Sequence, residues 1–141
     1  LLNHLGGARY TAPSAGSHPK GAVHPLALET LKSMGLPVDG LHSKSWEEFA
    51  QSKGPPLDMI VTVCDAAAGE VCPLWPGQLI TAHWGVEDPA TFQGTEDTQR
   101  AKFREVALIL RQRIEQFLSL PLATLDRRTV QAKLQEIGQQ A

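Results

Sequence analysis

The chain has 141 residues, of which 42% are hydrophobic and 20% charged, enough to form one domain with a hydrophobic core. Its net charge of -2, with dispersed basic residues, argues against a nucleic-acid or acidic-membrane partner. No apolar run approaches the roughly 18 residues that a membrane span requires. We therefore expect a cytoplasmic protein that binds neither nucleic acid nor membrane.

The first third of the chain alternates short elements with turns. Residues 1–7 are typical of the last turns of a helix with a glycine cap, and no initiator Met precedes them, so we expect the sequence to begin inside an element. Residues 9–12 are a strand candidate closed by Pro13, and a turn-rich loop follows. Pro25 then opens a helix that Gly35 ends. Ser45, with Glu48 three residues later, indicates a short capped helix.

Two strands are expected in the middle of the chain. Residues 57–64 form an apolar, β-branched run that suits a strand covered on both faces. Residues 79–82 form a second, shorter strand, and a loop ending on Asp88-Pro89 follows it. Strands that alternate with helices predict an α/β fold, a three-layer parallel sheet with helices on both faces.

The last third is expected to be helical. Thr95 can cap a long helix that reaches Pro121, with apolar residues every three and four positions. Its other face appears in the sequence as a solvated surface and carries Lys102, Arg104, Arg111, Gln112 and Arg113. A further helix begins near Asp126. We expect residues 1–122 to form the α/β domain and residues 123–141 a helical extension.

The two cysteines of the chain, Cys64 and Cys72, lie in one segment. The first ends the predicted strand, and a flexible Ala-Ala-Ala-Gly stretch separates it from the second, an arrangement suited to a redox pair. The alternative is a buried thiol at Cys64 and a surface thiol at Cys72. A zinc site with His83 is disfavoured, because zinc ligands usually come as closely spaced Cys pairs.

An ordered set of motifs resembles one known family. The motifs are Ser14-Ala15-Gly16, Val63-Cys64-Asp65, Cys72-Pro73-Leu74-Trp75-Pro76-Gly77, His83-Trp84-Gly85 and Asp88-Pro89. Each is weak alone, but their order and spacing resemble arsenate reductases of the low-molecular-weight protein tyrosine phosphatase fold. The resemblance extends from Leu1 to about Leu122. It implies a phosphatase-like parallel sheet and a nucleophilic P-loop of a Cys followed six residues later by Arg, a pattern that the printed sequence lacks.

The resemblance also implies residue roles. Asp88 matches the family's general acid, which protonates the water that leaves arsenate; the simpler interpretation of Asp88 is an ordinary Asp-Pro turn. Cys64 and Cys72 match the second and third thiols of the cascade, which end as a disulfide. No bound cofactor is implied. An external thiol reductant of thioredoxin or glutathione/glutaredoxin type is expected, and the spacing of the two cysteines leaves its identity open.

Three functions stay open at this point. The first is arsenate reduction by a complete protein that includes the P-loop. The second is a tyrosine phosphatase, against which Ala90 and Thr91 argue, because such enzymes typically carry aromatic residues after the Asp-Pro. The third is an inactive truncated product or a thiol sensor. We expect the 141-residue chain alone to be inactive, and a homodimer through the last helix stays open.

Overall fold

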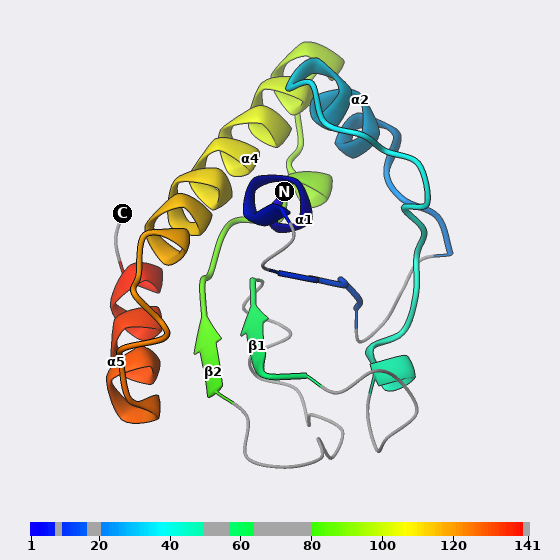
Figure 1. The fold of residues 1–141 in the computed structure, drawn as a ribbon. Coiled ribbons are helices and arrows are strands. Elements are labelled where there is room, and N and C mark those ends of the chain that lie inside the picture. The colour runs from blue at the N-terminus through cyan, green and yellow to red at the C-terminus, as the bar shows by residue number, and fades with distance from the viewer. Residues whose placement is uncertain (8–9, 17–20, 50–56, 64–79, 140–141) are drawn as a thin grey trace.

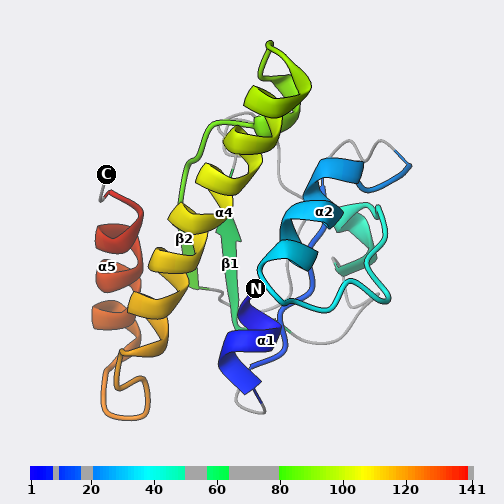
Figure 2. The same ribbon diagram turned by 90° about the horizontal axis from the view of Figure 1, so that it is seen from above.

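The structure is a computed structural model that describes residues 1–7, 10–16, 21–49, 57–63 and 80–139. Figures 1 and 2 show it from two directions. Its helices, 3-10 turns and strands, in chain order, are α1 (Leu2–Gly6), α2 (Pro25–Ser33), η2 (Trp46–Phe49), β1 (Met59–Thr62), β2 (Ile80–His83), η3 (Pro89–Thr91), α4 (Glu96–Leu118) and α5 (Arg127–Gly138).

The predicted parallel strands are confirmed. β1 and β2 run parallel, with Met59 opposite Ile80 and Thr62 opposite His83. β1 is shorter than the predicted run of residues 57–64, and the last of these lies outside the described residues. Pairing continues beyond the strands, because the Trp84 N–H donates to the Thr62 carbonyl at 2.7 Å and the Val86 N–H to the Val63 carbonyl at 2.8 Å. The helices and parallel strands confirm the α/β class.

Helix α4 is the longest element and extends diagonally across the molecule in Figure 1. The predicted cap is confirmed, because the Thr95 hydroxyl accepts from the Thr98 N–H at 3.2 Å. Its buried apolar residues are Phe103, Val106, Ile114 and Phe117. The prediction that Arg113 lies on a solvated face is wrong, because Arg113 is only 7% exposed. Arg113 lies seven residues after Val106, so it falls on the buried stripe.

Helix α5 packs beside β2, as Figures 1 and 2 both show. Leu134 is completely buried in a core that also contains Ala82, Trp84 and Ile114. The Trp84 indole N–H donates to the Leu134 carbonyl at 2.9 Å, so this polar group is satisfied inside the core. The segment 123–141, expected as an extension, thus contributes a helix to the core. The domain boundary at residue 122 stays a prediction.

On the edge of β2 that faces away from β1, a side chain forms hydrogen bonds with the strand backbone. The Gln131 amide oxygen accepts from the Thr81 N–H at 3.0 Å, and the same amide donates to the Thr81 carbonyl. A primary amide offers one acceptor and a donor pair, so it can replace a neighbouring strand at one residue. Gln131 of α5 therefore satisfies both the N–H and the carbonyl of Thr81 by hydrogen bonding.

Two local predictions differ from the structure. Tyr10–Ala12, the described part of the strand expected at residues 9–12, is not in a strand, and Ala12 instead bonds to the Asn3 amide through both its N–H and its carbonyl. The helix predicted after Ser45 is the 3-10 turn η2. The Ser45 hydroxyl accepts from the Glu47 N–H at 3.2 Å, one residue earlier than a capping box requires.

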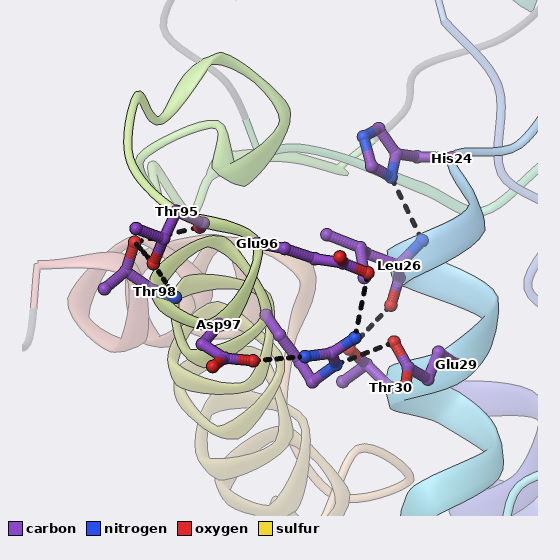
Figure 3. A network of polar contacts seen from close by, with 9 residues as sticks. His24, Leu26, Glu29, Thr30, Thr95, Glu96, Asp97 and Thr98 are labelled. Carbon is purple, nitrogen blue, oxygen red and sulfur yellow. Dashed lines mark hydrogen bonds and ion pairs between the residues drawn. The ribbon is translucent and has the colours of Figure 1, made fainter.

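Helix α2 packs against the first turns of α4. Arg100 of α4 lies between the carboxylates of Glu29, Glu96 and Asp97, with N–O distances of 3.0, 3.2 and 2.9 Å. Figure 3 labels these three acidic residues. These hydrogen bonds and charges, led by Glu29, raise the pKa of Arg100. On the same side, the His24 ring lies 4.7 Å from the Phe103 ring, and its Nδ1 accepts from the Leu26 N–H. His24 thus caps the N-terminus of α2.

None of the described helices is long and apolar enough to span a membrane.

The cap of α5 gives a prediction for the pH dependence of stability. The Asp126 carboxylate accepts from the Thr129 N–H at 2.7 Å, and the hydrogen bonds from the Thr129 backbone and hydroxyl lower the pKa of Asp126. The pKa of Asp126 is lower in the folded protein than in the unfolded chain. The cap therefore contributes its full stabilisation above the unfolded pKa of about 3.9, and this stabilisation is lost as pH falls through the folded pKa.

We expect Asp126→Ala to lower Tm at pH 7 by about 2–5 °C. Asp126→Asn, which keeps an acceptor but cannot titrate, should lose stability less steeply than wild type between about pH 5 and pH 2 in urea unfolding. Parallel curves for the two proteins would contradict the assignment.

A second prediction concerns Gly138 at the end of α5. A Cβ there would overlap the His83 carbonyl oxygen and lie 2.8 Å from Cδ1 of Trp84. Alanine usually stabilises a helix by about 1 kcal/mol relative to glycine. At Gly138 we expect the opposite, a loss of about 1–3 kcal/mol in the free energy of unfolding, because the backbone of β2 cannot move away without disturbing the core. Gly16→Ala is the control, since a Cβ at Gly16 would meet no atom of the described residues within 4 Å. A Gly138→Ala protein as stable as wild type would exclude this close approach.

Candidate active site

The loop that carries Asp88 begins at the carboxyl end of β2 and stays beside the carboxyl end of β1. The bond from the Val86 N–H to the Val63 carbonyl keeps the beginning of this loop beside the end of β1. Open α/β sheets bind their ligands outside the carboxyl ends of the strands. The position of Asp88 therefore agrees with that of a site residue.

The Asp88 carboxyl also shapes its own turn. Oδ1 accepts from the Ala90 N–H at 2.9 Å, and the Asp88 carbonyl accepts from the Thr91 N–H at 3.2 Å and from the Thr91 hydroxyl at 3.0 Å. Pro89 occupies the first position of η3. The turn interpretation of Asp-Pro is thus structurally correct. Within the described part of the chain, Oδ2 of Asp88 has no hydrogen-bond partner.

An apolar hollow of about 400 Å³ adjoins Asp88. Its walls come from Leu1, α2, α4, the residue after β1 and the loop, and apart from Thr30, Glu87 and Asp88 their side chains are apolar. The volume lies within the range of small-molecule sites. The described lining contains no Lys, Arg or His, so none of its described side chains supplies a cation for an oxyanion.

A second, larger hollow of about 820 Å³ lies along the loop and the end of α5. Its lining includes His83, Glu87 and Gln135. His83 Nδ1 lies 2.7 Å from the Thr62 hydroxyl, which fixes the ring at the end of the two strands. Within the described ranges, no group of His, Cys, Asp and Glu could hold a metal ion, and His83 belongs to none.

Helix α4 holds the loop through two basic side chains. Arg113 Nη1 donates to the Gly85 carbonyl at 3.0 Å. Lys102 Nζ lies 2.8 Å from a Glu87 carboxylate oxygen and 3.1 Å from one of Glu105, and 5.1 Å from the centre of the Phe92 ring. These hydrogen bonds, first that to Glu87, raise the pKa of Lys102.

Lys102 and Arg113 are the residues that the sequence-based interpretation missed. Both were assigned to a solvated face, yet the Lys102 side chain is 17% exposed and Arg113 is 7% exposed. For Arg113 a signal existed, because it lies three residues after Leu110 and seven after Val106. For Lys102 the partners are distant in sequence, and no local pattern indicates them.

The predicted thiol pair cannot be placed beside Asp88. Cys64 and Cys72 both lie outside the described residues. Cys64 directly follows Val63, which lines the hollow next to Asp88. The disulfide and the roles of the two thiols stay predictions.

Comparison with known proteins identifies the family. A family model described as low molecular weight phosphotyrosine protein phosphatase matches residues 2–135. Arsenate reductase from Halalkalibacterium halodurans is 33% identical over 111 residues, covering 79% of this chain and 76% of that protein. Arsenate reductase from Bacillus subtilis is 31% identical with the same coverage. Arsenate reductase from Bacillus licheniformis is 30% identical over 118 residues, or 81% of this chain and 78% of that protein. The chain therefore belongs to the low-molecular-weight phosphotyrosine protein phosphatase family.

Proposed function

We propose that the protein reduces arsenate to arsenite, with Asp88 as the general acid. The observation that carries this proposal is the position of Asp88, at the carboxyl end of the sheet and at the rim of an apolar hollow. The similarity to arsenate reductases over about three-quarters of the chain supports the choice of substrate. Because none of the described side chains of the hollow is cationic, we propose that a P-loop outside the printed sequence supplies the nucleophilic Cys and the donors that bind the oxyanion.

The chemistry proceeds in three thiol steps. The P-loop thiolate attacks arsenic, an As–S bond forms, and the departing oxygen leaves as water with a proton from Asp88. Cys64 then attacks the sulfur of the P-loop Cys, so the As–S bond breaks and its electron pair reduces As(V) to arsenite. Cys72 attacks Cys64 and frees the P-loop thiolate. The Cys64–Cys72 disulfide that remains is reduced by an external dithiol protein or by glutathione.

A phosphotyrosine phosphatase is the alternative, and the family description favours it. It requires the same P-loop and Asp88 but neither Cys64 nor Cys72. Ala90 and Thr91 follow Asp88-Pro89, and neither offers a ring to stack on phosphotyrosine. Hydrolysis of p-nitrophenyl phosphate, unaffected by Cys64→Ser and Cys72→Ser and without arsenate reduction, would favour the phosphatase.

The general-acid role can be tested in the complete enzyme. Asp88→Asn keeps an oxygen that can accept from the Ala90 N–H, so the turn should survive. We expect the rate of formation of the arsenic–thiolate ester to fall by about 10²-fold or more, with arsenate affinity largely unchanged. Asp39→Asn, at an exposed loop position away from the hollow, is the control. Rapid-quench single-turnover kinetics measure the step. A change in affinity alone would assign Asp88 to the structure of the loop.

The thiol cascade has its own test. After turnover of the complete enzyme without external reductant, peptide mapping should recover a peptide that joins Cys64 to Cys72, and added thiol should release it. Cys72→Ser should instead trap a disulfide between Cys64 and the P-loop Cys, because the resolving thiol is missing. If neither cross-link is found after arsenate turnover, the two cysteines do not carry the electrons.

A further inference from the structure

The turn that carries Asp88 has contacts within itself and separate contacts with helix α4. Inside the turn, the contacts of Asp88 go to Ala90 and Thr91, so they fix the shape of the turn and not its place over the hollow. Glu87 and Phe92, on the two sides of the turn, both contact Lys102 of α4. One side chain of the long helix thus touches both ends of the turn that carries the carboxyl.

The Lys102 contacts are suited to holding the turn in place. Its ammonium lies 2.8 Å from Glu87 and 3.1 Å from Glu105, and its side chain is 17% exposed. Glu105 belongs to α4 itself, so it fixes the ammonium on the helix, and Glu87 then fixes the loop to the ammonium. Two carboxylates already compensate the charge of Lys102, so this cation is unsuited to binding an oxyanion.

We propose that Lys102 is a positioning residue that sets the place of the Asp88 carboxyl over the hollow through Glu87 and Phe92. The proposal rests on the acid role proposed for Asp88. Glu87 is joined to Asp88 by one peptide bond, so a displacement of Glu87 moves the acid directly. A misplacement of about 1 Å can lower a rate by about 10²-fold, whereas ion pairs of exposed carboxylates contribute little to overall stability. Loss of the contact is therefore expected to affect the chemical step more than folding.

The experiment uses the complete enzyme and arsenate. Lys102→Met keeps most of the length of the side chain but removes its ammonium, and with it the ion pairs and the contact of the ammonium with the Phe92 ring. We expect kcat to fall by about tenfold and KM to change by less than about twofold. Lys102→Arg should restore most of kcat, because it keeps a cation within reach of Glu87. Glu87→Gln should reproduce the loss without altering α4, so the test does not depend on the folding of one variant. Arg111→Met, which removes the Arg111–Glu115 pair of the same helix, is the matched control and should leave kcat unchanged.

A double mutant distinguishes the positioning role of Lys102 from a general structural effect. If Lys102 acts through Asp88, Lys102→Met should add no further loss to Asp88→Asn. Backbone NMR order parameters of residues 87–92 should fall below about 0.85 in Lys102→Met, while those of β1 and β2 stay unchanged. Multiplicative losses in the double mutant, or an unchanged kcat in both Lys102→Met and Glu87→Gln, would overturn the inference alone. An Asp88→Asn enzyme with the wild-type rate would overturn the proposed function together with it.

Discussion

The position of α4 is the constraint on which the rest of the described structure depends. Its apolar stripe carries Phe117 and Ile114 into the core with Trp84 and Leu134. At its first turns, Arg100 and Phe103 contact Glu29 and His24 of α2. Lys102 in these first turns and Arg113 beside Ile114 hold the loop that carries Asp88. A shift of α4 would therefore move the hollow and the candidate acid together.

The elements with strong local signals were predictable from the sequence. Thr95 and Asp126 accept hydrogen bonds at the helix starts where their residue types indicate caps. The apolar, β-branched run before Val63 gave a strand, and the next apolar run gave its parallel neighbour. Such signals depend on contacts within a few residues along the chain, so no knowledge of the tertiary structure is required to find them.

The failed predictions for Ala12, Lys102 and Arg113 involve partners that are distant in sequence. Ala12 does not join a strand, because the Asn3 amide takes both its backbone groups. Lys102 reaches back to Glu87, and Arg113 to Gly85, although charged residues on a helix usually face solvent. Of the candidate site, Asp88 was predictable from its Asp-Pro motif, and the burial of Arg113 from its place on the apolar stripe. The contact of Lys102 with Glu87 was not predictable, because its partners are distant in sequence and leave no periodic pattern.

The amide of Gln131 has a consequence for how the sheet can grow. A parallel sheet extends only where a strand presents free N–H and carbonyl groups, and exposed edges of this kind promote pairing between molecules. At Thr81 both groups are already bonded to Gln131, and α5 covers the same side of β2. A strand from another molecule would have to displace this helix before it could pair there. Beyond its place in the core, α5 therefore protects the protein against edge-to-edge aggregation along β2.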